Sequence, residues 1–214
     1  DQDQLLDESL PITWRHINKL AGCGALGDLG SHLLSISQFI MGDITKVNAV
    51  ATTVFPKRPK SAGSTEMVDV ENEDIMTFMA EYANGAIGQI ACSRVATGRK
   101  NYLTYEIQGT KGSVRYDLER MGEVQVYFQS DNERDRGFRT VLLNPLMKGY
   151  SAFQPAGGIS IAYNDMKILE VHALFDAITN GADYVTDFEF GYKIDRTVAA
   201  VIESSKTHEW VDVK

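Results

Sequence analysis

The chain has 214 residues, 43% of them hydrophobic and 23% charged, with a formal net charge of −8. This is the composition of an ordinary globular protein, and no apolar run approaches the roughly 18 residues that a membrane-spanning helix needs. Scattered Lys and Arg residues in an acidic chain argue against nucleic acid as a partner, and no long basic amphipathic helix favours a membrane surface. Two cysteines, Cys23 and Cys92, are too few for a disulfide framework and indicate the reducing cytoplasm.

The first strongly patterned segment is predicted to be a helix from about Ala25 to Met41. Apolar residues recur in it at helical spacing and form one stripe, made of Leu26, Leu29, Leu33, Ile36 and Ile40. Gly42 is a typical stop signal for such a helix.

Residues 44–143 are predicted to form a series of short strands. Short segments rich in β-branched and aromatic residues alternate with turn signals, namely 44–55, 74–82, 86–95, 102–108, 112–118, 123–129 and 138–143. Asn84-Gly85 is a strong hairpin signal between two of them. Residues 56–73 hold Pro, Ser, Gly and acidic residues and predict a long loop. Short connections between successive strands predict an antiparallel meander.

The chain then returns to helix. Residues 164–180 and 188–205 carry apolar side chains at helical spacing, and Asn180-Gly181 supplies a stop for the first of these helices. Residues 209–213 predict a last strand. Strands flanked by helices indicate the α+β class, with an open, mainly antiparallel sheet and helices packed on one face.

A glycine-rich segment matches the sequence pattern of a nucleotide-binding motif. Gly22-Cys23-Gly24-Ala25-Leu26-Gly27 matches the pattern G-x-G-x-x-G. That motif needs a buried strand before it and a βαβ unit around it. Residues 14–21 are largely polar and a meander follows, so we expect a glycine lead-in to a helix packed close to another backbone.

An acid and an imidazole share one face of the first helix. Asp28 and His32 are four residues apart, and Ser35 joins the same stripe at about 100° per residue. A carboxylate beside an imidazole orients the ring and suits a general acid or base near neutral pH. The same spacing also suits a surface ion pair or a packed histidine. No third ligand stands at a helpful spacing, so we predict no metal site.

The ordered set of motifs resembles the C-terminal domain of the glucose–fructose oxidoreductase / inositol dehydrogenase (Gfo/Idh/MocA) family. The resemblance begins with Trp14-Arg15 and Ala21-Gly22-x-Gly24-Ala25-Leu26-x-Asp28-x-Gly30-x-His32. It runs over nearly the whole chain through Gly42, Asn84-Gly85-Ala86, Gly98-Arg99-Lys100-Asn101, Gly109-Thr110-Lys111-Gly112-Ser113, Glu170 to Gly181, Asp187-Phe188 and Glu209-Trp210-Val211.

The resemblance implies that residues 1–214 form a single C-terminal domain for substrate binding and oligomerisation, whose N-terminal Rossmann domain is missing from this chain. NAD or NADP would be bound mainly by that missing domain, and the substrate would be a sugar, cyclitol or related polyol. In the family, the position of His32 commonly acts as the base that removes the hydroxyl proton, and Asp28 sits beside it. This chain alone is then expected to be inactive.

Further residues are weaker candidates. The resemblance suggests that Arg15 and Trp14 contact the cofactor or substrate. The alternative for Arg15 is a structural ion pair, and packing is favoured for Trp14. Arg99 and Asn101 follow a strand and are candidates for substrate hydroxyls, with a solvated loop as the alternative. Tyr163 precedes a helix and is a further candidate. Ser35 departs from the family, since many members carry Asp there, and puts the substrate in doubt.

The protein is also expected to form an oligomer, and two alternative functions remain open. Family members suggest a homo-oligomer formed through the open sheet face, because a large bare apolar face favours association. The first rival is a non-catalytic sugar-binding or assembly subunit. The second is a redox-neutral lyase or glycosidase that oxidises its substrate transiently.

Overall fold

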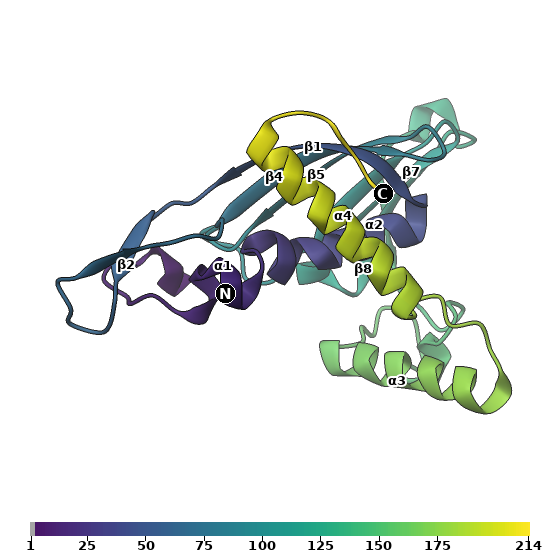
Figure 1. Ribbon diagram of the computed structural model, residues 1–214. Coiled ribbons are helices and arrows are strands. Elements are labelled where there is room, and N and C mark those ends of the chain that lie inside the picture. The colour runs from purple at the N-terminus through teal and green to yellow at the C-terminus, as the bar shows by residue number, and fades with distance from the viewer. Residues whose placement is uncertain (1–2) are drawn as a thin grey trace. The chain divides into compact units, whose positions relative to one another are not determined.

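The computed structural model describes residues 3–214, which divide into two compact units (Figure 1). The first unit holds the chain up to Arg99 together with Thr186–Lys214, and the second holds Lys100–Val185. The expected mixture of helices and antiparallel sheets is confirmed, and we describe each unit by itself.

The first unit is built on a four-stranded antiparallel sheet of order β10-β1-β4-β5. Its strands are β1 (Ile44–Thr52), β4 (Ile75–Tyr82), β5 (Ile87–Ser93) and β10 (Val211–Asp212). The predicted Asn84-Gly85 turn connects β4 and β5, and Gly85 adopts φ +85°, which glycine reaches without strain. The predicted strands of this part are therefore confirmed.

One face of this sheet carries the core. Strand β4 alternates, so that Met76, Phe78, Ala80 and Tyr82 are buried while the residues between them are more exposed. The buried face is covered by η3 (Leu26–Gly30), α2 (Ser31–Met41) and α4 (Phe188–Thr207), which Figure 1 shows in dark blue and yellow. Helices on one face of an antiparallel sheet are the predicted arrangement.

Buried polar side chains fix the helices on the sheet. Gln38 of α2 donates to the hydroxyl of Thr197 on α4 at 3.2 Å and accepts the backbone N–H of Ile44 at 3.1 Å. The Ser204 hydroxyl of α4 accepts the backbone N–H of Ala49 on β1 at 2.9 Å. Because unsatisfied buried polar groups are costly, these bonds select one placement of α4 over α2 and β1.

The first predicted helix has the expected extent but an irregular start. Its opening residues, η3, form a π-helical turn in which the N–H of Ser31 reaches back to the carbonyl of Leu26. The helix passes close to β5 there, since a Cβ on Gly30 would lie 3.1 Å from the Cys92 sulfur. Single π turns inside helices are frequent at functional sites.

The expectation of one long loop over residues 56–73 is wrong in part. These residues include a two-stranded antiparallel ribbon of β2 (Lys57–Pro59) and β3 (Met67–Asp69). Buried Arg58 accounts for it: its guanidinium donates to the backbone carbonyls of Leu5, Asp7 and Leu10. The ribbon thereby holds the N-terminal segment, with its short helices η1 (Asp3–Leu6), η2 (Trp14–His16) and α1 (Asn18–Ala21).

The second unit contains a four-stranded antiparallel meander, β6-β7-β8-β9, and one long helix. Its elements are β6 (Thr104–Gln108), β7 (Gly112–Asp117), η4 (Leu118–Arg120), β8 (Glu123–Phe128), η5 (Glu133–Asp135), β9 (Arg139–Leu142), η6 (Tyr150–Ala152) and α3 (Tyr163–Asn180). All four strands and the helix were predicted within a few residues.

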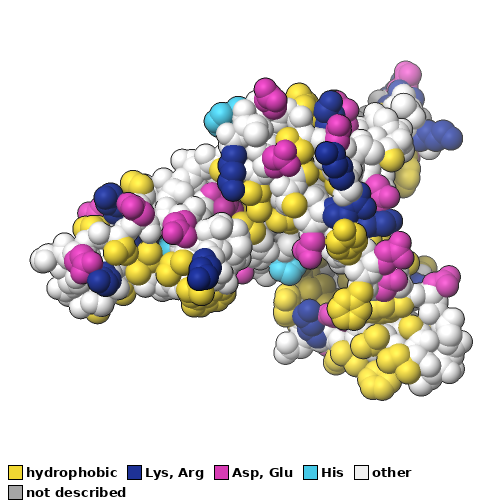
Figure 2. Space-filling view, viewed as in Figure 1, with side chains coloured by type: hydrophobic (Ala, Val, Ile, Leu, Met, Phe, Trp, Pro, Cys, Tyr) yellow, Lys and Arg dark blue, Asp and Glu magenta, His cyan; other side chains and the backbone are white. Residues whose placement is uncertain are grey.

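Helix α3 exposes much of its apolar face. Figure 2 shows hydrophobic side chains gathered over it, and the exposed ones include Ile168, Val171, Leu174, Phe175 and Ile178. Such a face is more typical of a surface that another chain segment covers than of one left in water. Over residues 3–214, neither α3 nor another helix combines the length and apolar character needed to cross a bilayer.

Candidate functional site

A pocket of about 570 Å³ lies between the beginnings of α2 and α4 in the first unit. Helix α2 contributes Ser31, His32 and Ser35, and the start of α4 contributes Thr186, Asp187, Phe188, Phe190, Gly191, Tyr192, Ile194 and Asp195. A concave site with a few polar groups among aromatic side chains, in this volume range, is typical of a small-molecule site.

The α2 wall carries two of the predicted site residues. His32 is exposed in the first turn of α2, and Ser35 lies one turn further on, so both face the same pocket. The Ser31 hydroxyl donates to the carbonyl of Gly27 at 2.8 Å and is committed to the helix backbone. His32 and Ser35 are therefore the α2 side chains available to a bound molecule.

Asp28 lies in the π-helical turn, outside the lining of this pocket. Its carboxylate is 3.9 Å from Nε of Arg15, and both side chains are about half exposed. The Arg15 guanidinium in turn lies over the ring of Trp14, 4.4 Å from its centroid. The structure thus joins Asp28, Arg15 and Trp14 in one exposed cluster and joins His32 with Ser35 in the pocket.

The glycine-rich segment before the helix is occupied by a side chain of the protein itself. The Glu73 carboxylate accepts the N–H of Gly24 at 2.9 Å and that of Leu26 at 2.8 Å. The Glu73 carbonyl accepts the N–H of Ala25 at 3.0 Å. These N–H groups would cradle a pyrophosphate in a nucleotide-binding motif. Here they are already used, which gives a physical reason why this motif is not a phosphate site.

Replacing Gly24 by alanine is expected to destabilise the protein. A Cβ at Gly24 would lie 1.9 Å from the Glu73 carbonyl oxygen, so the backbone of one segment has to move and the capping bonds weaken. Overpacking of this kind costs about 1–3 kcal/mol. Urea unfolding of the Gly24→Ala variant tests this, with Gly137→Ala as the control because open space surrounds Gly137. Equal stability of the two variants would contradict the close approach.

Buried polar residues lie behind the exposed cluster of Asp28, Arg15 and Trp14. Arg94 and Asp74 form an ion pair at 2.8 Å with side chains 1% and 5% exposed. His16 is also buried, and its Nδ1 accepts the backbone N–H of Thr13 at 3.0 Å. Burial, reinforced by the Arg94 and Arg58 charges, holds the pKa of His16 below its usual value. A neutral His16 thus shapes the turn that presents Trp14 and Arg15, a role that no sequence pattern indicated.

The other predicted contacts lie outside the pocket. Arg99 ends the first unit in an exposed turn. Asn101 belongs to the second unit, where its N–H donates to the Glu119 carboxylate at 3.2 Å. Tyr163 begins α3, with the Lys167 ammonium 5.8 Å from its ring centroid. As substrate contacts, these three residues stay predictions.

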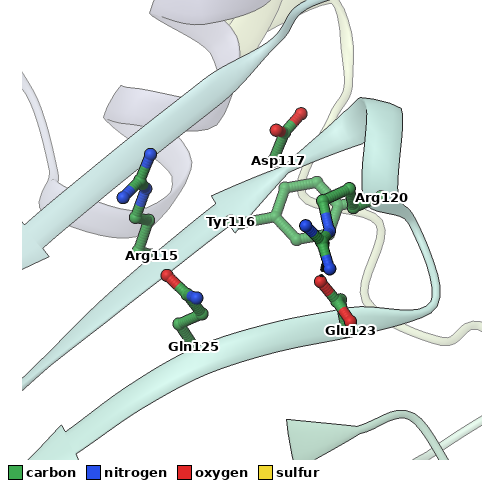
Figure 3. Close-up of a pocket in the computed structure, with 6 residues that line it drawn as sticks. All are labelled: Arg115, Tyr116, Asp117, Arg120, Glu123 and Gln125. Carbon is green, nitrogen blue, oxygen red and sulfur yellow. Dashed lines mark ion pairs between the residues drawn. The ribbon is translucent and has the colours of Figure 1, made fainter. Parts of the chain in front are cut away.

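A second, smaller pocket on the β7–β8 hairpin is a weaker candidate. It has a volume of about 220 Å³ and is lined by Arg115, Tyr116, Asp117, Arg120, Glu123 and Gln125 (Figure 3). Its charges are largely used within the hairpin. Arg120 pairs with Glu123 at 2.5 Å, and the Asp117 carboxylate accepts the N–H of Glu119 at 2.9 Å. Paired charges on a strand surface favour a structural role.

Neither a metal centre nor a reactive thiol stands out in the part of the chain that the structure describes. Across residues 3–214, no three His, Cys, Asp or Glu side chains gather as metal ligands would. Burial raises the pKa of the Cys92 thiol to about 12, and burial together with the Glu73 charge also raises that of Cys23. Both thiols are therefore poor nucleophiles.

Sequence reasoning missed the whole α4 wall of the pocket. Tyr192 and Asp195 sit in a helix whose pattern predicts only packing, more than 150 residues after His32 in the chain. The only local signal was Asp187, a helix-capping residue type whose carboxylate accepts the N–H of Phe190 at 2.9 Å. Long-range packing of α4 on α2, which no periodicity encodes, creates this wall.

An antiparallel sheet covered by helices on one side, with a polar and aromatic pocket between two of them, is the framework of a small-molecule binding domain. The family model described as "GFO/IDH/MocA C-terminal domain" matches residues 2–115, slightly more than half of the chain. The chain belongs to this family, as its motifs predicted.

Individual proteins similar to this chain are consistent with the family match. Levoglucosan dehydrogenase from Pseudarthrobacter phenanthrenivorans is 38% identical over 225 aligned residues, which cover 99% of this chain and 57% of that protein. D-apiose dehydrogenase from Rhizobium rhizogenes is 30% identical over 102 residues, covering 44% of this chain and 26% of that protein. A solved structure of levoglucosan dehydrogenase with NADH and levoglucosan superposes with a TM-score of 0.89 at 38% identity, covering 97% of this chain and 55% of that one. The chain thus spans little more than half the length of its levoglucosan dehydrogenase relative.

Proposed function

We propose that the chain is the substrate-binding domain, residues 1–214, of a NAD(P)-dependent oxidoreductase that acts on a hydroxyl of a sugar, cyclitol or related polyol. The observation that carries the proposal is the placement of His32, an exposed imidazole in a pocket of about 570 Å³ between α2 and α4. The sugar dehydrogenases among its relatives favour a sugar, and levoglucosan is the first candidate.

His32 is the group proposed to take the proton. An imidazole in an open pocket can accept the proton of a substrate hydroxyl and later release it to water. Ser35, one turn away on the same wall, can donate or accept a hydrogen bond to another hydroxyl. Asp28 is held by Arg15 and supplies negative charge at the adjacent turn.

The residues of this chain are suited to contact a nicotinamide cofactor, although not to hold its pyrophosphate. The glycine-rich N–H groups are taken by Glu73, so the pyrophosphate has to be held elsewhere, by an N-terminal Rossmann domain in our proposal. The exposed Trp14 ring with Arg15 stacked on it offers a flat, cationic surface for contact with the cofactor. When bound, the cofactor supplies hydride transfer.

The experiment uses the full-length protein. Because we expect the protein to be cytoplasmic, the assay is run under reducing conditions that keep its thiols reduced. Purified protein is incubated with NAD or NADP and a panel of levoglucosan, D-apiose and myo-inositol, and formation of the reduced cofactor is recorded. Reduction with at least one compound supports the dehydrogenase. Product formation without net cofactor reduction would favour the redox-neutral lyase or glycosidase, and binding without turnover would favour the non-catalytic subunit.

A homo-oligomer through the open sheet face is part of the proposal. Val50, Met79 and Ile87 are exposed apolar residues on the sheet strands β1, β4 and β5. Light scattering of the full-length protein at micromolar concentration is expected to give a dimer or larger assembly. Met79→Glu is expected to shift it toward the monomer, whereas Met67→Glu, an equally exposed site on the β2–β3 ribbon, is not. A monomeric wild type would contradict the proposal.

A further inference from the structure

The α4 wall of the pocket carries two carboxylates in different situations. Asp187 caps α4, since its Oδ1 accepts the backbone N–H of Phe190 at 2.9 Å, and this bond ties the carboxylate to the helix start. Asp195 lies two helical turns further along and lines the same pocket. Among the described residues, no hydrogen bond or ion pair engages the Asp195 carboxylate. A bound molecule thus meets in Asp195 a carboxylate whose two oxygens can both accept its hydrogen bonds.

The lining of the pocket brings Asp195 together with residues of α2. Asp195 lines the pocket together with Ser31, His32 and Ser35. Asp195 also contributes, after burial and the Glu73 charge, to the raised pKa of Cys23 in the glycine-rich segment ahead of the helix. Asp195 and His32 therefore line the same pocket from different helices, α4 and α2.

The rim beside Asp195 suits a carbohydrate. Phe188 is 99% exposed and Tyr192 is 64% exposed, and both belong to the pocket lining. Fully exposed aromatic rings are costly in water, and they can pack against the apolar C–H face of a sugar ring. A carboxylate next to such rings recognises hydroxyl groups, because an ionised carboxylate is a pure acceptor with two oxygens. Neutral polyols with adjacent hydroxyls match this combination.

We propose that Asp195 is a substrate-binding residue that determines specificity: its carboxylate accepts hydrogen bonds from hydroxyl groups of a sugar held between α2 and α4, while a different hydroxyl of the same sugar meets His32. This inference rests on the proposed function and refines it, since it assigns the recognition of the non-reacting hydroxyls to α4. It also predicts that the pocket rejects deoxy sugars that lack those hydroxyls.

The test compares Asp195→Asn with the wild-type full-length protein, using levoglucosan and its deoxy analogues as probes. A hydrogen bond to a charged group is worth enough that KM for levoglucosan is expected to rise about 10- to 100-fold. KM for the cofactor and the pH profile of kcat are expected to stay unchanged, because the proton acceptor is His32. On the deoxy analogue that lacks the recognised hydroxyl, variant and wild type are expected to perform alike.

A matched control separates recognition from helix stability. Glu203→Gln neutralises another exposed carboxylate of α4, which lies outside the pocket lining, and is expected to leave KM as in the wild type. Unchanged KM in Asp195→Asn would overturn the inference, as would an effect confined to the pH profile of kcat. If both variants raised KM equally, the effect would belong to the helix and the inference would also fall.

Measuring the binding of levoglucosan tests the role of Asp195 separately from catalysis. If the wild-type protein turns over none of the sugars, the proposed function fails, and calorimetric titration of levoglucosan into wild type and Asp195→Asn still decides the inference. Heat of binding that is lost in Asp195→Asn supports it. Equal binding by the two proteins, or binding by neither, overturns it.

Discussion

Replacing His32 by alanine in the full-length protein is expected to lower kcat for sugar oxidation by about 10²- to 10⁴-fold, because a positioned general base contributes that much. The side chain is exposed in the pocket, so its loss leaves the core of the first unit intact. Steady-state kinetics of cofactor reduction measures the effect. The variant is expected to unfold at the same temperature as the wild type.

A control distinguishes this role from a general effect of removing imidazoles. His172 is an exposed histidine of α3, and His172→Ala is expected to retain wild-type kcat. Near-normal turnover in His32→Ala would contradict the role that we assign to His32. Loss of activity in both variants would point to damage that is unrelated to proton transfer.

Replacing Arg94 by methionine is expected to destabilise the protein by about 3–5 kcal/mol, because it leaves the Asp74 carboxylate buried without its counter-charge. The pair is almost fully excluded from water, with Arg94 1% and Asp74 5% exposed. Asp74 also accepts the backbone N–H of Val54 at 2.8 Å, so it cannot simply turn away from the core. Urea unfolding followed by tryptophan fluorescence gives the free energy of unfolding.

The exposed Lys57–Asp69 pair of the β2–β3 ribbon provides the comparison. Its side chains are 61% and 78% exposed, so Asp69→Asn is expected to change the free energy of unfolding by less than about 1 kcal/mol. Similar effects of the two substitutions would mean that the Asp74–Arg94 pair contributes no more than a surface ion pair. The residues of the proposed site would then lack the rigid support that the buried pair implies.

Much of the fold follows from local patterns in the sequence. The apolar stripe of residues 26–40, the alternation along β4 and the Asn84-Gly85 turn all predict the elements that form there. These signals are local, because each depends on residues within a few positions of one another. The β2–β3 ribbon was missed since its stability comes from Arg58, which binds carbonyls about 50 residues away in the sequence.

The site was less predictable than the fold. A regular spacing of about 100° per residue predicts Asp28 on the same helix face as His32, and this proximity stays a prediction. The local patterns did not indicate the π-helical turn that contains Asp28, or the Arg15 guanidinium 3.9 Å from its carboxylate. The roles of Glu73 and of the α4 wall depend on packing between segments that are far apart in the chain. Single-sequence patterns contain no information on such contacts, which only the folded chain brings together.

A crystal structure of the full-length protein with its reduced cofactor and levoglucosan tests the role of His32. We expect the sugar to lie between α2 and α4, with one of its hydroxyl groups within about 3.2 Å of an imidazole nitrogen of His32. A sugar bound away from His32, for example over Arg115 and Gln125 on the β7–β8 hairpin, would contradict it.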